Sequence, residues 1–245
     1  MDNIHLIMPM GGRGSRFQGL EECPKPLIPL HKRPFFYWAT QSIVKNIEVK
    51  DITFVILKEH IERFRIDEQI KKYYPTAKMV VIPEVLDGAV LTCREGIKDI
   101  TDAGSLIFND CDHAFRSREF EEFCRNIGDY SPDGALLSFL STEPVYSYLQ
   151  KNNDGNVIQT VEKKVISNEA ICGCYYFRNK QIFSETIDLY LEECSYKEYF
   201  VSGMYNTMAR NGMIIRSFPV DYHIPFGIPE EYEDAKKDLR IKELL

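Results

Sequence analysis

Short apolar runs alternate with amphipathic stretches through the first half of the chain. The runs have the length of strands, and in the stretches between them apolar residues recur at helical spacing. The pattern predicts strands at residues 4–10, 52–57, 78–83 and 104–109 and helices at residues 34–46, 59–73, 88–99 and 117–127. This strand–helix rhythm is typical of a doubly wound α/β fold, in which a mostly parallel sheet carries helices on both faces.

The second half is richer in strand-like runs. It predicts strands at residues 134–141, 145–150, 156–162, 171–177 and 213–220 and helices at residues 180–193, 199–211 and 230–242. No repeat, linker or low-complexity segment divides the sequence. We therefore expect a single domain over residues 1–245, with one half at 1–128 and a β-rich half at 129–245.

Composition narrows the class of protein. The net charge of −7 disfavours a nucleic-acid surface, which needs clustered Lys and Arg. The seven cysteines are scattered and odd in number, which indicates reduced thiols, and we interpret Cys172 and Cys174 as packing residues. No run approaches the ~20 apolar residues of a membrane span. The first residues also lack the charged and then apolar pattern of a signal peptide. Together these features predict a cytoplasmic protein that binds neither membrane nor nucleic acid.

A glycine-rich loop follows the first strand. Gly11, Gly12 and Gly14 lack Cβ atoms, so backbone N–H groups there can approach phosphate oxygens closely. Arg16 offers a fork of donors, and Lys25, held between two prolines, offers a point charge in a stiff segment. The loop predicts a triphosphate site, with a solvated turn as the alternative. It matches neither the dinucleotide fingerprint nor the P-loop, which place glycine and lysine differently.

Two carboxylates follow the apolar strand predicted at residues 104–109. Asp110 and Asp112 would lie at the carboxyl edge of the sheet, near the glycine loop. Carboxylate oxygens suit Mg²⁺, which binds one or two of them together with substrate phosphates. The alternative is an Asx turn that caps the next helix. We interpret His113 as a loop residue, with a role supporting the metal ligands as the other option.

The motif Gly11-Gly12-Arg13-Gly14-Ser15-Arg16-Phe17, with Pro24-Lys25-Pro26-Leu27, resembles the signature of the sugar-phosphate nucleotidylyltransferases. The chain is most similar to small bacterial members linked to capsule and surface-polysaccharide synthesis. The resemblance implies a Rossmann-like fold, nucleotide binding by residues 11–16, and catalysis by Arg16 and Lys25 at the α-phosphate. It also implies Mg²⁺ bound by Asp112, with Asp110 as the second choice.

The resemblance extends into the second half. There it implies that Glu162 accepts a hydrogen bond from a hydroxyl or amine of the acceptor, that Lys163 pairs with its phosphate, and that Gly173 leaves it room. Without the resemblance, Glu162 and Lys163 would be interpreted as a solvated strand end and Gly173 as a bulge.

Two positions depart from the family pattern. Pro225 occupies the place of a second metal-binding Asp, so Asp221 or His223 would have to substitute, and Mg²⁺ favours the carboxylate of Asp221. Pro83 occupies the place of a base-reading Gln.

The base would then be read by other groups. We expect Glu84 and the bare backbone of Gly88 to contact it. An ionised Glu84 can only accept, which weakly favours CTP over UTP and dTTP and leaves purines last.

The expected reaction joins a nucleoside triphosphate to a phosphorylated sugar or small phospho-alcohol and releases pyrophosphate. A related glycosyltransferase and a non-catalytic nucleotide-binding regulator are the alternatives. Release of pyrophosphate from a triphosphate distinguishes the first alternative, and tight binding without turnover would indicate the second. The sequence leaves the acceptor and the assembly state open, a homo-oligomer included.

Overall fold

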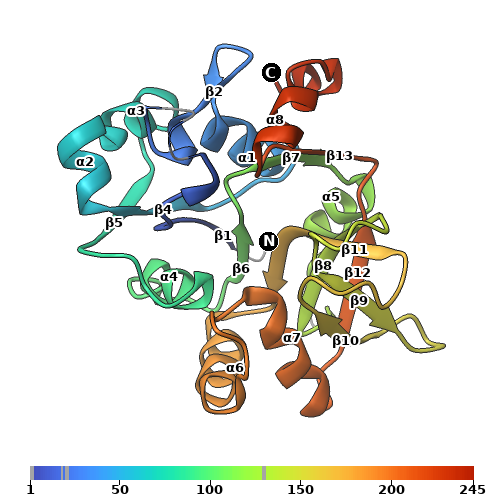
Figure 1. The fold of residues 1–245 in the computed structure, drawn as a ribbon. Coiled ribbons are helices and arrows are strands. Elements are labelled where there is room, and N and C mark those ends of the chain that lie inside the picture. Colours follow the sequence, from blue (N-terminus) through green and yellow to red (C-terminus); the bar gives the residue numbers. More distant parts are fainter. Residues whose placement is uncertain (1–2, 18, 20–21, 129–130) are drawn as a thin grey trace.

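A nine-stranded mixed sheet forms the centre of the computed structural model (Figure 1), which describes residues 3–17, 19, 22–128 and 131–245. Its strand order is β10-β9-β11-β6-β1-β4-β5, with β8 paired to β11 and β12 paired to β8. The strands of the first half, β6, β1, β4 and β5, run parallel, whereas β11 joins β6 antiparallel. The sequence-based fold class is confirmed.

The elements follow the predicted order closely. The strands are β1 (Ile4–Met10), β2 (Pro29–Leu30), β3 (Arg33–Pro34), β4 (Asp51–Leu57), β5 (Lys78–Ile82), β6 (Ser105–Asn109), β7 (His113–Arg116), β8 (Gly134–Leu140), β9 (Tyr148–Lys151), β10 (Val157–Val161), β11 (Glu169–Phe177), β12 (Ile215–Pro219) and β13 (Tyr222–Pro225). The helices are α1 (Phe35–Val44), α2 (Lys58–Phe64), α3 (Ile66–Tyr73), α4 (Ala89–Gly96), α5 (Arg118–Arg125), α6 (Lys180–Glu193), α7 (Val201–Arg210) and α8 (Pro229–Ala235), with short 3₁₀ segments η1 (Ser15–Phe17), η2 (Lys25–Leu27) and η3 (Leu239–Leu244).

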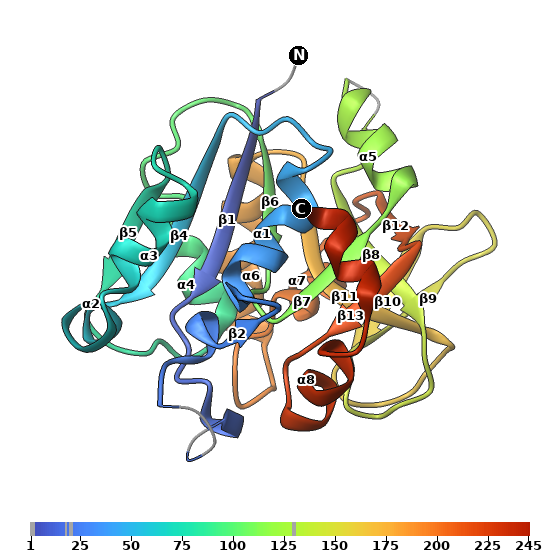
Figure 2. The same cartoon turned by 90° about the horizontal axis from the view of Figure 1, so that it is seen from above.

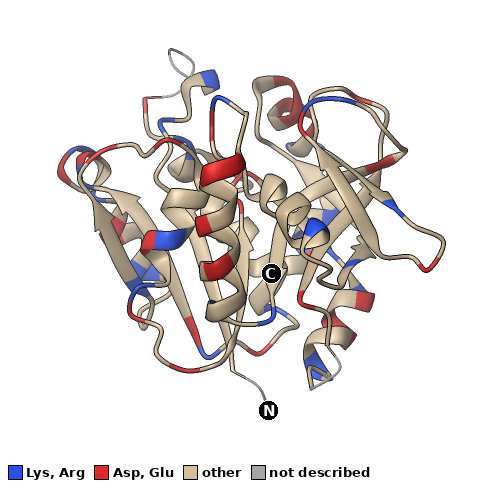
Figure 3. Cartoon of the chain, turned by 90° about the horizontal axis from the view of Figure 1, so that it is seen from below, with Lys and Arg blue, Asp and Glu red and all other residues tan. Residues whose placement is uncertain are grey.

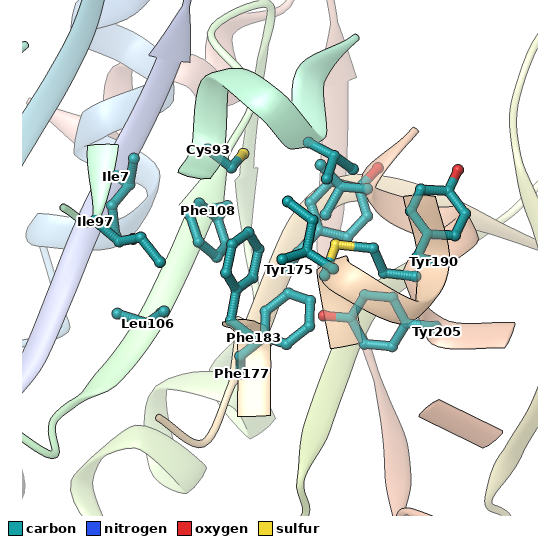
Figure 4. Close-up of a cluster of buried hydrophobic side chains, with 14 of the residues drawn as sticks. Ile7, Cys93, Ile97, Leu106, Phe108, Tyr175, Phe177, Phe183, Tyr190 and Tyr205 are labelled. Carbon is teal, nitrogen blue, oxygen red and sulfur yellow. The ribbon is translucent and has the colours of Figure 1, made fainter. Parts of the chain in front are cut away.

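Each face of the sheet has its own buried core. Alternate side chains of a strand point to opposite faces, so Ile7 joins one core while Leu6 and Met8 join the other. The first core packs against α4, α6 and α7 and contains the aromatic cluster around Phe108 and Phe183 (Figure 4). The second packs against α1, α3 and α5. Because the strands are covered on both faces, their sequences are nearly continuous apolar runs.

A third core lies beneath the glycine loop and joins the two ends of the chain. Phe17 and Phe35 pack against Phe226 and Tyr232, with ring centroids of Phe35 and Phe226 4.4 Å apart. Trp38 is fully buried in the same cluster and donates a 2.7 Å hydrogen bond to the Leu30 carbonyl. In Figure 2 the C-terminal segment and α8 lie beside β2 and α1.

The structure differs from the predicted elements at several places, and three of them bear on the site or its support. The helix expected at residues 59–73 is divided into α2 and α3 by Arg65, which adopts a left-handed conformation with φ 53°. The helix expected at residues 230–242 ends at Ala235 and resumes as η3. Strands β7 and β13 pair antiparallel as a separate small sheet that the apolar pattern does not predict.

Charged groups are concentrated at the amino end of β1. His5 is buried and lies 2.8 Å from a carboxylate oxygen of both Asp51 and Asp102, and Lys50 and Lys78 pair with the same two carboxylates. Elsewhere acidic and basic residues are interspersed over the helices and loops (Figure 3). Across the described ranges, no helix is both long and apolar enough to span a bilayer.

Candidate active site

The glycine loop begins where β1 ends, at the carboxyl edge of the parallel strands. Gly14 has φ +60°, and a Cβ on it would lie 2.6 Å from Cβ of Lys25. Both its backbone conformation and its contact therefore require glycine. Gly11 is buried next to Ile82, whereas Gly12 is exposed and a Cβ there would meet nothing within 4 Å. Lys25 therefore packs beneath the turn at Gly14, while the backbone at Gly12 on the outside of the loop is accessible to a ligand.

Arg16 and Lys25 are placed by short 3₁₀ segments on either side of this turn. Phe17 anchors η1 in the third core, which leaves the neighbouring Arg16 exposed and facing the site. Pro24 precedes Lys25 in an extended conformation, and Pro26 is buried. The two prolines thus fix the start of the Lys25 side chain, as expected from their sequence positions.

The carboxylates Asp110 and Asp112 face these cations, and Lys25 forms an ion pair with Asp112. Burial and the neighbouring Asp112 raise the pKa of Asp110. Burial alone would raise the pKa of Asp112, but the Lys25 ammonium holds it below its usual range. Burial alone would lower the pKa of Lys25, and Asp112 raises it instead. Two close carboxylates with one paired cation form a site that attracts further positive charge.

One cavity of about 410 Å³ brings seven of the predicted residues together. It is lined by Gly14, Ser15, Arg16, Lys25, Asp110, Glu162 and Lys163. Residues from α7 and the segment before it, Glu198, Phe200 and Val201, complete the wall. The cations of the first half and the charged pair of the second half thus face the same space.

The second half of the chain contributes Glu162 and Lys163 to the wall of this cavity, and hydrogen bonds fix the orientation of Glu162. Glu162 accepts 2.6 Å from the Ser147 hydroxyl and also accepts from the Ser202 hydroxyl. Lys163 has φ 52°, which turns the chain after β10, and its ammonium lies 5.7 Å from the ring centroid of Phe200. A carboxylate held by two hydroxyls is preorganised, because its orientation does not depend on a ligand.

Gly173 lies at a bulge in β11, where the pairing register with β8 shifts between Ile171 and Tyr175. Its φ is +79°, and a Cβ would lie 2.9 Å from Oδ2 of Asp110. The interpretation of Gly173 as a bulge is therefore confirmed, and Gly173 also lines a second cavity. This cavity, of about 150 Å³, is lined by Arg16, Asp110 and Asp112 among others and adjoins the first, with which it shares Arg16 and Asp110.

Six predicted residues lie outside these cavities, and for two of them, Asp221 and Gly88, the structure shows a different role. Asp221 accepts from the backbone N–H and the guanidinium of Arg118, at the far end of β13 from Pro225. It is therefore not brought to the carboxylate pair. Gly88, with φ +129°, is required because a Cβ would lie 2.4 Å from the backbone nitrogen of Tyr199. Glu84 is exposed and does not line either cavity.

Arg13 is also exposed, and neither it nor Gly11 or Gly12 lines the two cavities. Gly12 and Arg13 lie on the exposed side of the loop, whereas Gly11 is buried beneath it.

The β7–β13 pair brings in groups that sequence reasoning did not predict. The Glu231 carboxylate accepts from the backbone N–H of Gly227, at 2.9 Å, and from the Tyr146 hydroxyl, at 2.7 Å. Acidic residues after Pro229 are a signal for a helix N-terminus, which would have indicated Glu231. Tyr146 and Ser147 carried no such signal, because their position depends on long-range pairing.

His113 and His223 also line the second cavity, with ring centroids 5.5 Å apart. Burial lowers the pKa of His113 to about 4 and that of His223 well below its usual range, so both imidazoles are neutral at pH 7. His113 belongs to β7 and is buried, so the interpretation of a loop residue was wrong.

Comparison with known proteins agrees with this geometry. The nucleotidyl transferase family model matches residues 5–235. A D-glycero-alpha-D-manno-heptose 1-phosphate guanylyltransferase from Aneurinibacillus thermoaerophilus is 25% identical over 240 residues, which cover 97% of this chain and 99% of the relative.

Solved structures show the same fold. A nucleoside-diphosphate-sugar pyrophosphorylase from Vibrio cholerae superposes with a TM-score of 0.81 at 21% identity, over 95% of this chain and 100% of that chain. An inositol-1-phosphate CTP transferase from T. maritima superposes with a TM-score of 0.76 at 15% identity, over 99% and 97%. Since the family model matches nearly the whole sequence, the chain belongs to the nucleotidyl transferase family and is a sugar-phosphate nucleotidyltransferase.

Proposed function

We propose that the enzyme transfers a nucleotidyl group from a pyrimidine nucleoside triphosphate to a phosphorylated sugar or small phospho-alcohol and releases pyrophosphate. The observation that supports this most directly is the meeting of Arg16, Lys25 and the Asp110–Asp112 pair with Glu162 and Lys163 around two adjoining cavities at the carboxyl edge of the sheet. Such an edge is where open α/β sheets bind their ligands.

The reaction we propose is an in-line attack by an acceptor phosphate oxygen on the α-phosphorus. A new P–O bond forms to the acceptor as the bond to pyrophosphate breaks, without an enzyme nucleophile. Transfers of this type gain mainly from positioning and charge neutralisation. The open backbone of the glycine loop would hold the triphosphate, and Arg16 and Lys25 would neutralise charge on the transferring group.

The carboxylate pair fits the divalent metal that enzymes of this family generally use. Asp110 and Asp112 supply hard oxygen donors, and Lys25 is the ion-pair partner of only one of them among the described residues. We propose Mg²⁺ here, with Asp112 as the principal ligand. When bound, the ion would neutralise phosphate charge beside Lys25.

The acceptor would bind against the second-half wall. Glu162 is oriented to accept a hydrogen bond from a hydroxyl or amine, and Lys163, the residue next to it, would pair with the phosphate. An acceptor that carries both a phosphate and a hydroxyl or amine would bind to both residues. In keeping with the family resemblance, we propose a cytoplasmic role in making surface-polysaccharide precursors.

The base preference rests on the departure at Pro83 and on Glu84. The names of the relatives include both a guanylyltransferase and a CTP transferase. We propose CTP or UTP and test the choice by thermal shift with each triphosphate and Mg²⁺, because a ligand of the native state raises stability with its affinity. If GTP or ATP gives the largest shift, the pyrimidine assignment and the role of Glu84 are wrong.

The reaction is tested by release of pyrophosphate from labelled CTP and UTP with a panel of sugar phosphates and phospho-alcohols. We expect release that requires both the acceptor and a divalent metal. Lys163→Gln should raise the acceptor KM, whereas the exposed Lys164→Gln should not. Tight triphosphate binding without release across the panel would contradict the proposed reaction and support a regulatory role.

A further inference from the structure

Three metal-binding side chains meet beside the carboxylate pair, and the proposed reaction uses none of them. They are His113 of β7, Cys172 of β11 and His223 of β13, and one donor atom of each lies within 4.8 Å of the others. All three residues line the second cavity. We propose that these residues bind a Zn²⁺ ion through two imidazole nitrogens and one thiolate, separately from the Mg²⁺ at the aspartates.

Hydrogen bonds fix the tautomer of His113 in the form that a metal requires. The Asn109 amide donates 2.9 Å to the Ala39 carbonyl, which orients its own oxygen toward His113. His113 Nε2 lies 3.1 Å from that oxygen and must donate to it. The lone pair of Nδ1 is therefore available, and it faces Cys172. Metal-binding histidines are usually held in this way through the second nitrogen.

The spacing of the first two donors matches a zinc site. His113 Nδ1 lies 3.5 Å from Cys172 Sγ. Tetrahedral zinc, with ordinary Zn–N and Zn–S bond lengths, places such atoms about 3.5 Å apart. Cys172 lies within the register shift of β11, between Ile171 and Tyr175. Binding would release the thiol proton to solvent and leave the thiolate on the ion.

His223 supplies the third donor. Both of its ring nitrogens are buried, and neither has a hydrogen-bond partner among the residues that the structure describes. Buried polar atoms without partners are rare in native proteins and call for an explanation. A movement of about 1 Å would bring this imidazole to bonding distance. The fourth position would open into the cavity, as in zinc sites that keep an exchangeable ligand.

The donor set also separates this ion from Mg²⁺. Two imidazoles and a thiolate prefer zinc and cobalt, whereas carboxylates prefer magnesium. The negative charge of Asp112 nearby favours any cation here.

The test is a titration of the chelator-treated full-length protein with Co²⁺, without nucleotide. We expect one equivalent to bind with a thiolate-to-cobalt charge-transfer band, and Zn²⁺ but not Mg²⁺ should displace it. His223→Phe should fold, because the ring has no hydrogen bond to lose and lies 4.2 Å from Phe139 between centroids. It should weaken binding at least ~10-fold.

Cys172→Ser should abolish the band, whereas Cys174→Ser, two residues along the same strand and equally buried, should keep it. Absence of the band in the native protein would overturn the proposal. So would a band of unchanged affinity in His223→Phe, or one that survives in Cys172→Ser. Because no nucleotide is present, these results do not depend on the proposed transfer reaction.

Discussion

Replacing Lys25 with Met tests the proposed chemistry most directly. Methionine keeps a side chain of similar length in the space under Gly14, where the Lys25 Cβ packs, and removes only the ammonium. Two consequences follow, one for catalysis and one for stability.

The catalytic effect should be large. If the ammonium stabilises charge on the transferring group, its loss should lower kcat by about 10²–10³, as for other single positioned donors. This corresponds to about 2.7–4 kcal/mol of transition-state free energy.

The effect on stability can be bounded from the geometry. The side chains of Lys25 and Asp112 are 16% and 28% exposed, between a surface pair and a fully buried one. Breaking such a pair should therefore cost about 1–3 kcal/mol of unfolding free energy. Most of this cost is the carboxylate that is left without a partner. The double variant Lys25→Met/Asp112→Asn should recover at least about 1 kcal/mol of stability, but no activity.

The assays are urea unfolding and steady-state pyrophosphate release, each on the two single variants and the double. A folded Lys25→Met enzyme with kcat within about threefold of the native value would refute the catalytic role. A double variant no more stable than Lys25→Met would refute the ion-pair argument.

Three further predictions follow from the same geometry. Asp112→Asn should abolish metal-dependent activity in initial rates measured against Mg²⁺ concentration, and Asp110→Asn should reduce it less; the reverse ranking would make Asp110 the principal ligand. Gly14→Ala should lose about 1–2 kcal/mol of unfolding free energy in urea, because the φ of Gly14 is positive and a Cβ there would clash with Lys25. Gly12→Ala, whose Cβ meets no atom, should unfold like the native protein. Equal stabilities of the two variants would contradict the contact. Asp102 has a pKa held low chiefly by Lys50 and His5, so its stabilisation is present above the ordinary carboxyl pKa of about 4 and is lost as the pH falls through its folded value. Asp102→Asn should therefore be less stable at pH 7, with a difference that shrinks below about pH 4, and a difference independent of pH would show that the charge is not responsible.

The sequence predicted the parts of the fold that depend on local pattern. The buried parallel strands are continuous apolar runs, so β1, β4, β5 and β6 appear at or within a residue of their predicted ends. The break at Arg65 has no such signal, because a left-handed non-glycine residue is imposed by the packing of α2 and α3. Strands β7 and β13 are four residues each and pair residues that lie more than about 100 positions apart in the sequence, which periodicity cannot show.

The residues of the candidate site also divide into those that a local motif predicts and those that long-range strand pairing brings in. Arg16, Lys25 and the two aspartates were found because their motifs are short and follow a strand. Glu231 and His223 were not assigned these contacts, since each depends on where β13 lies against β7. The metal role of Asp221 rested on sequence spacing alone, and the pairing directs this residue to Arg118 instead.

The third core has a consequence for the order in which the protein can become active during synthesis. The support beneath the glycine loop includes Tyr232, Ile241 and Leu244, which are synthesised after all the strands of the central sheet. The strands of the first half can pair earlier, but Phe17 and Phe35 stay uncovered until these residues arrive. Contacts between distant parts of a chain form late because the loop between them must first close. Triphosphate binding should therefore appear only after residues 226–244 have been synthesised and packed, and a protein truncated before Phe226 should not bind the nucleotide.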